Sequence, residues 1–224
     1  MNKYKSIIFD CDGVILNSNK IKTESFRKIM IQFDKNAVEE FINYHKNNGG
    51  LSRYIKLDYF LTNILPKYSK CHRNKDSLLL SLIKNYGKEC KESLFKSDVA
   101  NDLEKLKYIT PNIPWTIVSG GDQKELRDVF KYKKIDRYFN GGIFGSPDKK
   151  IDIIKRESLN GLINYPALFL GDSKLDHQVA KMLNIDFLFV TKWTDFNEFN
   201  FYCEANSIDM ISSVSDLIDI FQNV

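Results

Sequence analysis

The sequence predicts an α/β fold in which a parallel β-sheet carries an inserted all-helical segment. A short apolar run at residues 6–9 predicts a strand, and no further strand pattern occurs between about residue 16 and residue 112, where apolar residues recur at helical spacing. From residue 115 onward, short apolar runs alternate with helical stretches, which is typical of a parallel sheet. The chain therefore begins one sheet, leaves it for a helical insert, and returns to it.

The insert is predicted to contain four helices. Apolar residues follow a 3.6-residue period over 21–33 and again over 38–45, and the polar and glycine residues at 47–50 end the second helix. A third helix is expected over 54–65 and a fourth over 78–86. An insert of this kind forms a small helical subdomain beside the sheet.

The remaining elements of the sheet are expected after the insert. Strands are predicted at 115–118, 167–170 and 187–190, with helices at 122–130 and 176–183 between them. Alternation of this kind places the carboxyl ends of the strands at one edge of the sheet, where ligands of open parallel sheets bind.

The expected domain limits follow from this order of elements. Residues 1–16 together with 90–224 form the sheet-bearing core, and residues 17–89 form the helical cap. The first strand ends at Asp10, so an insert that starts shortly afterwards lies over the ligand-binding edge and is placed to act as a lid.

Composition narrows the class of protein. The chain has 224 residues, 43% of them hydrophobic, and a dispersed formal net charge of +4, which does not favour a nucleic-acid partner. It has no run of about 18 apolar residues, so neither a membrane span nor a secretory signal is expected. The expected location is therefore the cytoplasm. Reduced thiols are expected because no C-x-x-C pair occurs among the four cysteines, which are Cys11, Cys71, Cys90 and Cys203.

The end of the first strand carries two carboxylates one residue apart, Asp10 and Asp12, followed by Gly13. Residues i and i+2 of a strand share a face, so the two carboxylates can leave the sheet together, and a cation between them is favourable. Mg²⁺ prefers oxygen ligands and is usually held by one or two carboxylates. A calcium-binding EF-hand loop is a weak alternative, because its twelfth position would be Ile21 in place of glutamate.

Polar residues also follow the later strands. Ser119 and Gly120 stand at a strand end before a helix, where backbone N–H groups and the helix dipole suit a phosphate oxygen. Asp172 and Asp176 follow the next predicted strand and can share a face in the first helical turn, which offers a further acid for the metal. A lysine pair, Lys149-Lys150, precedes another helix; we favour Lys150 as the cation that neutralises phosphate and nucleophile.

These pieces, taken in order, resemble the four motifs of the haloacid dehalogenase superfamily: D-x-D-G, Ser-Gly-Gly after a strand, a lysine, and G-D-S-x-x-D. The helical insert resembles the helical cap of the branch that includes beta-phosphoglucomutase and phosphoglycolate phosphatase. The resemblance implies a Rossmann-like core that binds Mg²⁺. It implies these roles: Asp10 as nucleophile and metal ligand, Asp12 as general acid and base and metal ligand, Ser119, Gly120 and Lys150 on phosphate, Asp172 on the metal, and Asp176 supporting the metal site.

The cap contains further candidates. Residues 50–53, Gly-Leu-Ser-Arg, resemble a stretch in the cap of beta-phosphoglucomutase-like members in which the arginine contacts a second anionic group of the substrate, so Arg53 and Ser52 are expected to determine specificity. Lys22 falls near a position where mutases of that group carry a histidine, and it is a third specificity candidate. His45, His72 and His177 lack metal-ligand spacing, and no role is assigned to them.

The function that these observations favour is a Mg²⁺-dependent phosphatase acting on a small phosphorylated metabolite, such as a sugar phosphate, through an aspartyl-phosphate intermediate. Two alternatives remain. A phosphomutase would return the phosphoryl group to another hydroxyl, and a binding or regulatory protein would keep the fold without turnover. The presence of Asp12 argues against carbon–halogen cleavage, because the dehalogenases of the superfamily lack that aspartate and need no metal.

Overall fold

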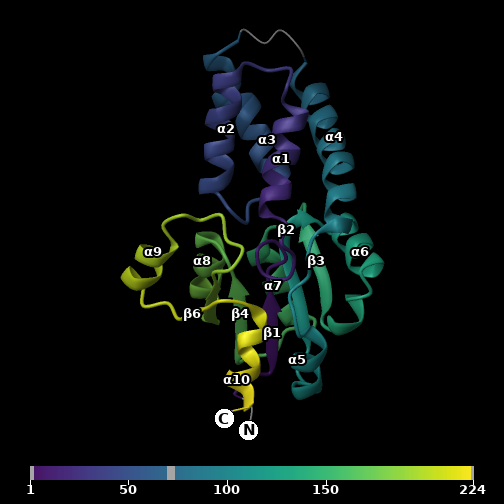
Figure 1. Cartoon of the computed structure of the whole chain (residues 1–224), viewed down its shortest axis with the longest axis vertical. Helices are drawn as coiled ribbons and strands as arrows, with labels where there is room; N and C mark the ends of the chain where they lie inside the picture. The colour runs from purple at the N-terminus through teal and green to yellow at the C-terminus, as the bar shows by residue number, and fades with distance from the viewer. Residues whose placement is uncertain (1–2, 70–73, 223–224) are drawn as a thin grey trace.

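The computed structural model describes residues 3–69 and 74–222; Cys71 and His72, considered above from the sequence, lie outside these residues. It shows a sheet-bearing core with a helical cap stacked on one end of it (Figure 1). The cap emerges from the end of the core where the strands finish. In the described part of the chain, no helix combines the length and the apolar character needed to cross a membrane.

The core is built on one six-stranded sheet in the order β3-β2-β1-β4-β5-β6, with every neighbouring pair parallel. This confirms the predicted α/β class. The sequence patterns did not predict β3 or β6, because β3 contains two glycines and β6 has only two residues. The strands are β1 (Ser6–Phe9), β2 (Trp115–Asp122), β3 (Gly142–Ser146), β4 (Ala167–Gly171), β5 (Asp186–Val190) and β6 (Met210–Ile211).

Strand β1 lies in the middle of the sheet and is buried on both faces, as continuous apolar strands of parallel sheets are. Ile7 and Phe9 pack on one face and Ile8 on the other, because successive side chains alternate. Phe9 pairs in register with Ile117 of β2 and Leu170 of β4. The residues that follow these three positions therefore meet at one edge of the sheet.

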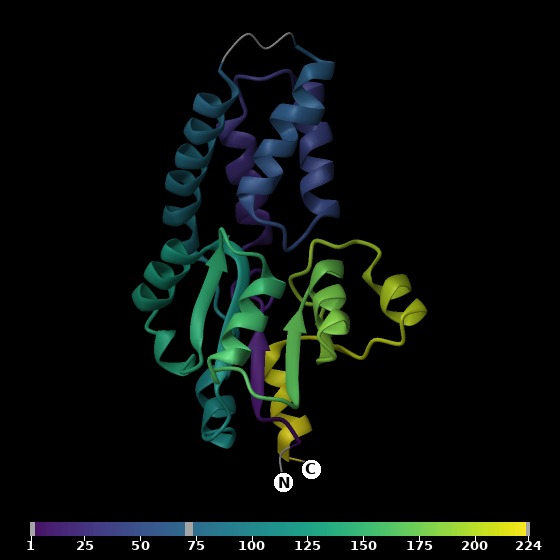
Figure 2. The same ribbon diagram turned by 180° about the vertical axis from the view of Figure 1, so that it is seen from behind.

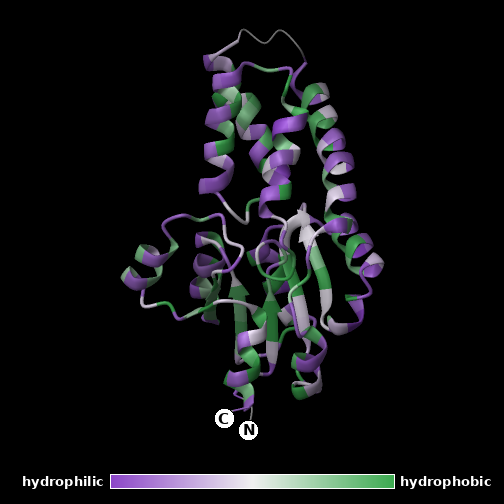
Figure 3. Cartoon of the chain, viewed as in Figure 1, coloured by the Kyte–Doolittle hydropathy of each residue, from purple (hydrophilic) through white to green (hydrophobic). Residues whose placement is uncertain are grey.

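Helices cover both faces of the sheet (Figures 1 and 2). Apolar side chains of α7 and α8 pack on the face of Ile8, and those of α5, α6 and α10 pack on the face of Phe9. Figure 3 shows the strands between them as a largely hydrophobic layer. The bounds are α5 (Leu103–Ile109), α6 (Gln123–Tyr132), α7 (Lys150–Leu159), α8 (Lys174–Met182), α9 (Phe199–Ala205) and α10 (Leu217–Gln222).

The cap contains α1 (Asn19–Ile29), α2 (Lys35–Asn47), α3 (Arg53–Tyr59) and α4 (Lys75–Lys96). Aromatic rings form its centre, with the ring of Phe26 5.1 Å from Phe41 and 4.0 Å from Tyr86 between centroids. Edge-to-face and tilted contacts of this kind add to the burial of apolar area. The cap therefore has an apolar core of its own.

The third predicted helix, over 54–65, differs from the structure. It is α-helical only as far as Tyr59 and continues as a π-turn over Phe60–Ile64 and a 3₁₀ turn over Leu65–Lys67. Pro66 has no N–H to donate to the carbonyl four residues earlier, and its ring would clash with that carbonyl. The helix has the wider π turn before the proline and the tighter 3₁₀ turn at the proline, so its end is displaced from the path of a regular α-helix.

Two chain segments connect the cap with the core. The incoming segment at Leu16 and Asn17 pairs with the outgoing segment at Asp98 and Val99, where the Asn17 N–H donates to the Asp98 carbonyl over 3.0 Å. Helix α4 runs without a break to Lys96, so the proposed limit between residues 89 and 90 falls inside it. A movement of the cap would bend the paired segments and leave α4 whole.

Candidate active site

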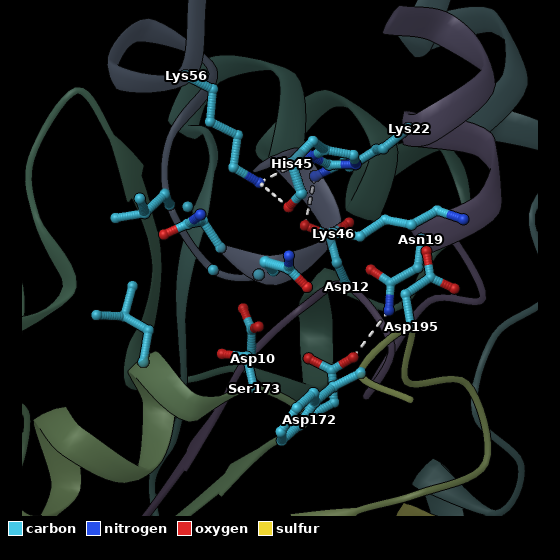
Figure 4. A pocket seen from close by; sticks show the side chains of 18 of the residues that line it. Asp10, Asp12, Asn19, Lys22, His45, Lys46, Lys56, Asp172, Ser173 and Asp195 are labelled. Carbon is cyan, nitrogen blue, oxygen red and sulfur yellow. Dashed lines mark hydrogen bonds and ion pairs between the residues drawn. The ribbon is translucent and has the colours of Figure 1, made fainter. Parts of the chain in front are cut away.

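A cavity of about 410 Å³ lies between the carboxyl edge of the sheet and the cap. Asp10 directly follows β1, Gly120 belongs to the end of β2, and Asp172 directly follows β4, so the register of the sheet brings them together. Helices α1, α2 and α3 contribute the opposite wall, including Lys22 and Lys56 (Figure 4). The predicted edge of the sheet is the edge that carries the cavity.

Asp10 is 2% exposed, and its carboxylate is held from two sides. The Cys11 N–H donates to Asp10 Oδ1 over 2.7 Å, and the Lys150 Nζ lies 2.9 Å from the same oxygen. Lys150, the first residue of α7, also donates to Asp176 Oδ1 over 2.5 Å and is buried. Lys149 is exposed, and the contacts with the two carboxylates are made by Lys150. Of the lysine pair, the structure brings Lys150 to the proposed nucleophile.

Three carboxylates gather beside one another. One oxygen each from Asp10, Asp172 and Asp176 lies within 4.8 Å of the others, and all three residues are buried. The Asn19 amide donates to Asp172 Oδ2 over 2.8 Å, and the Ser173 hydroxyl donates to Asp176 Oδ2 over 2.6 Å. This cluster contains Asp176 in place of Asp12, the third metal ligand that the sequence predicted. Asp12 lines the same cavity but directs its carboxylate elsewhere.

Gly13 allows the cluster to form. Its φ is +76°, in the left-handed region that favours glycine, and a Cβ there would lie 2.0 Å from Asp172 Oδ2. Any side chain at position 13 would therefore displace Asp172. The glycine that follows the two aspartates lets the turn after β1 pass directly beside the carboxylate of the neighbouring strand end.

The electrostatics of the cluster fit a divalent cation. Burial and the neighbouring carboxylates raise the pKa of Asp10 to about 7, against the effect of Lys150, and raise the pKa of Asp172 well above its ordinary value. Both shifts arise first from burial and then from the neighbouring carboxylates, which a cation bound among the three would offset. Oxygen ligands, close spacing and surplus negative charge are what Mg²⁺ requires, so the residues present suit the metal that the sequence implied.

Asp12 is ion-paired with the cap. Its Oδ2 contacts the Lys22 Nζ, and its Oδ1 accepts a 2.6 Å hydrogen bond from the Ser18 hydroxyl. Burial alone would raise the pKa of Asp12, but Lys22 and Ser18 hold it below its ordinary value. The partner effect is reciprocal: burial opposes the charge on Lys22, and Asp12 nevertheless raises the pKa of that lysine. Lys22, a predicted specificity residue, thus holds a catalytic candidate ionised.

The carboxyl end of β2 has the features of a phosphate cradle. Ser119 is fully buried, and its Oγ accepts from the Gly121 N–H over 3.0 Å. Helix α6 begins immediately afterwards, capped by Asp122, whose Oδ1 accepts from the Glu125 N–H. A Cβ at Gly120 would lie 2.2 Å from the carbonyl oxygen of Gly50 in the cap. The cap loop therefore closes directly onto the phosphate-binding loop.

Arg53 lines the cavity but already has partners. Its Nη2 donates to Glu125 Oε2 over 2.6 Å, and its guanidinium lies over the ring of Tyr86, 4.7 Å from the centroid. Both ends of this ion pair are buried, with side chains 6% and 9% exposed. Ser52, the other candidate of this stretch, is the N-cap of α3, accepting from the Ile55 N–H over 3.4 Å. In this arrangement Arg53 fastens the cap to the core, and Ser52 caps a helix inside the cap.

A second basic side chain of α3, Lys56, enters the cavity wall without having been predicted. It is 4% exposed and donates to His45 Nδ1 over 2.8 Å and to the His45 carbonyl over 3.3 Å. The other nitrogen of His45 lies 3.1 Å from the Thr23 hydroxyl. Burial lowers the pKa of Lys56 to about 7, and burial also lowers the pKa of His45. His45, for which the sequence suggested no role, is the contact that orients this lysine.

Sequence reasoning missed four side chains of the site: Ser18, Asn19, His45 and Lys56. For Ser18 and Asn19 a signal exists, since both are polar and stand at the start of the first helix after the D-x-D-G motif. For His45 and Lys56 there was none, because they belong to different helices and meet only where α2 and α3 come together in the folded cap.

Comparison with known proteins agrees with this geometry. The family model of the haloacid dehalogenase-like hydrolases matches residues 7–190, which is most of the chain. None of the curated proteins compared with the sequence gives a match.

Several solved structures share the fold over nearly their whole length. A predicted phosphoglycolate phosphatase from Haemophilus somnus has a TM-score of 0.74 at 18% identity, covering 98% of this chain and 99% of its own. A haloacid dehalogenase-like family hydrolase from Streptococcus pneumoniae has a TM-score of 0.68 at 19% identity, with 99% and 100% covered. Beta-phosphoglucomutase from Clostridium difficile has a TM-score of 0.67 at 16% identity, with 98% of each chain covered.

At these identities the structural likeness establishes the fold, and the family match establishes the affiliation that the four motifs suggested. The chain belongs to the haloacid dehalogenase-like hydrolases.

Proposed function

We propose that this hydrolase is a Mg²⁺-dependent phosphatase that acts on a small phosphorylated metabolite through an aspartyl-phosphate on Asp10. The observation that carries the proposal is the 2.9 Å contact between the Lys150 Nζ and Asp10 Oδ1 inside the buried carboxylate cluster. A nucleophilic carboxylate with a fixed ammonium beside it is suited to attack a phosphorus atom that carries negative oxygens. The cavity of about 410 Å³ suits a small metabolite.

Asp10 attacks as a carboxylate. One of its oxygens forms a bond to phosphorus while the bond to the leaving oxygen breaks, which splits a difficult hydrolysis into two steps. Lys150 favours the ionised form of Asp10 against burial and lies where the transferred group arrives. Mg²⁺, held by Asp10 and Asp172 with Asp176 behind them, would supply positive charge at the phosphoryl oxygens. Asp12 stays a proposed ligand, with its carboxylate engaged by Lys22 and Ser18.

Asp12 moves the protons. Asp12 is ionised against Lys22 in the unliganded site, so it takes up a proton from solvent before the first step. Its carboxyl then donates that proton to the leaving oxygen as the bond from that oxygen to phosphorus breaks. The resulting carboxylate accepts a proton from the water whose oxygen bonds to phosphorus while the bond from phosphorus to Asp10 breaks. The contact with Lys22 favours the ionised, proton-accepting form. That form serves the second step, in which Asp12 accepts a proton from the attacking water.

The carboxyl end of β2 binds the phosphate. The Ser119 hydroxyl, whose oxygen accepts from the Gly121 N–H, keeps its own proton to donate, and the dipole of α6 favours the anion there. The approach of Gly50 to Gly120 excludes bulk water from this region when the cap is closed. The substrate enters when the cap opens and is enclosed when it closes.

The test is release of inorganic phosphate from a panel of sugar phosphates, nucleotides and phospho-acids, with Mg²⁺ and with EDTA. Asp10→Asn is expected to lower kcat by about 10⁴-fold or more, because the nucleophile is lost, and EDTA is expected to abolish release by the wild type. Asp209→Asn, a matched change at an exposed aspartate, controls for the loss of one carboxylate. Phosphate release that survives Asp10→Asn refutes the mechanism.

The same assay separates the phosphatase from the mutase. A mutase yields an isomeric phosphate ester without net phosphate release, and it requires a bisphosphate to phosphorylate Asp10. If the substrate is consumed while the concentration of inorganic phosphate stays constant, the reaction is phosphoryl transfer and not hydrolysis.

A further inference from the structure

The cations around the cavity differ in what they already contact. Lys150 pairs with Asp10 and Asp176, Lys22 contacts Asp12, and Arg53 pairs with Glu125. Each of these side chains is buried or nearly so, and each has a carboxylate partner, as buried charges require.

Lys56 is the exception. Among residues 3–69 and 74–222, no carboxylate oxygen lies within 4.0 Å of its Nζ, although the residue is 4% exposed. Its contacts are the imidazole and the carbonyl of His45, both of which accept from it. An ammonium group has three donors, so one remains beyond these two contacts. A buried cation without a counter-charge costs free energy of folding. An anion that binds beside such a cation at a cavity wall recovers part of that free energy as binding affinity.

The direction of the side chain is fixed. Lys56 extends from α3 into the cavity, and the ring of His45 holds its end in place on the cap side, across from Asp10 (Figure 4). His45 is itself held by Thr23 of α1, 3.1 Å from its Nε2. Two other lysines, Lys46 and Lys174, line the cavity but are exposed, so water satisfies their charge.

We propose that Lys56, positioned by His45, binds a second anionic group on the leaving-group side of the substrate. The substrate class is then a small phosphomonoester whose alcohol carries a carboxylate or a second phosphate. This inference rests on the proposed phosphatase activity for its reaction. The sequence predicted that Arg53 recognises the second anion, but Glu125 already neutralises its charge. The proposal assigns this role to Lys56, the one buried cation among the described residues that has no carboxylate partner.

The experiment uses phosphate esters matched in length that differ only at the far end of the alcohol. 2-Phosphoglycolate ends in a carboxylate, ethylene glycol bisphosphate in a phosphate, and 2-hydroxyethyl phosphate in a neutral hydroxyl; their three-carbon counterparts extend the set. Lys56→Met is expected to lower kcat/KM for the charged esters by about 10- to 100-fold, the worth of a buried charge-assisted hydrogen bond. It is expected to change kcat/KM for the neutral esters and for p-nitrophenyl phosphate by less than about threefold. The carboxylate and phosphate arms show which anion is preferred.

Two controls separate recognition from structure. Lys84→Met removes an exposed lysine of the same cap and is expected to leave all the esters unaffected. Because Lys56→Met removes a buried charge that lacks a carboxylate partner, it is expected to raise the melting temperature of the unliganded protein. An equal loss on charged and neutral esters, or a wild type that does not prefer the charged ones, overturns the proposal.

A binding measurement keeps this inference separate from the proposed function. If the wild type releases phosphate from none of the esters, the proposed activity fails, and recognition is then measured with Mg²⁺ as the rise in melting temperature that each ester produces in Asp10→Asn. Stabilisation by the charged esters that is lost in Asp10→Asn/Lys56→Met supports the role of Lys56. Equal stabilisation with and without Lys56 refutes it.

Discussion

The two walls of the cavity are built by different means. On the core wall, each acidic side chain follows a strand end, and the register of the parallel strands alone brings Asp10 and Asp172 together. On the cap wall, Lys56 and His45 come from separate helices and meet through helix packing. The core wall carries surplus negative charge, and the cap wall carries a cation without a carboxylate.

This difference matches a division of labour. The groups that form and break bonds to phosphorus stand on the rigid sheet, where a small error in position would be costly. The groups that meet the rest of the substrate stand on the cap, where side chains change without disturbing the sheet. If this division holds, substitutions on the core wall lower turnover of every ester, and substitutions on the cap wall alter the preference among esters.

The largest expected effect lies on the core wall. Lys150→Met removes the ammonium beside Asp10 and is expected to lower kcat by about 10³-fold on all esters, because a fixed charge at the transferred group is lost. Steady-state kinetics over the ester panel measures it. Lys149→Met is the matched control, since this neighbouring lysine is exposed, and it is expected to change kcat by less than about twofold. A loss confined to the charged esters would place Lys150 in recognition and break the comparison.

The core wall was largely predictable from the sequence. Its side chains lie in short motifs that directly follow apolar runs, so a local pattern locates them. Because the strands are parallel, their carboxyl ends meet at one edge of the sheet, and the local pattern is then sufficient to predict that these side chains lie together. The local pattern did not show which side chain each aspartate of the site contacts. Asp12 and Asp176 were both predicted near the metal, but the capture of Asp12 by Lys22 depends on how α1 leaves the core.

The cap wall was less predictable for a physical reason. Arg53 stands in a recognisable stretch, yet its partner Glu125 lies 72 positions away on α6 and neutralises it. Lys56 stands three residues later in α3, where a lysine in sequence resembles any solvated lysine. Whether such a side chain is free to bind a ligand is decided by its contacts, and those follow from the packing of the cap against the core.

An intermediate effect is expected where the two walls touch. Gly120→Ala places a Cβ 2.2 Å from the backbone carbonyl of Gly50, so the cap loop must shift. This is expected to lower kcat/KM about 10- to 100-fold, since closure is incomplete, and to destabilise the fold by about 1–3 kcal/mol. Kinetics and thermal melting measure the two effects. Gly161→Ala, a glycine with φ +75° and open space around it, is expected to cost stability alone. Unchanged kinetics in Gly120→Ala would mean that the contact with Gly50 plays no part in closure.

The smallest effect is a change in the slope of stability with pH, and it tests the cap wall without any substrate. Burial lowers the pKa of Lys56 from 10.5 to about 7. Between these values the unfolded chain binds a proton at residue 56 that the folded protein does not, so the contribution of Lys56 to stability rises with pH from about 7 to 10.5 and is lost as pH falls through that window. Lys56→Met has no such proton.

The melting temperature of Lys56→Met is therefore expected to exceed that of the wild type by the most at pH 7 and below, and the gap is expected to narrow as pH rises toward 10. Groups that do not interact with residue 56 cancel in this difference, and His45, whose pKa burial and Lys56 lower from 6.5, titrates below this window. Lys84→Met should show a gap that does not vary with pH. Saturation with a doubly charged ester should flatten the slope, because an anion beside Lys56 restores its charge. A difference in melting temperature that is constant with pH in the unliganded protein would mean that the charge of Lys56 is already neutralised, as the charges of Lys22 and Lys150 are. The two walls of the cavity would then differ in where their residues lie and not in their charge balance.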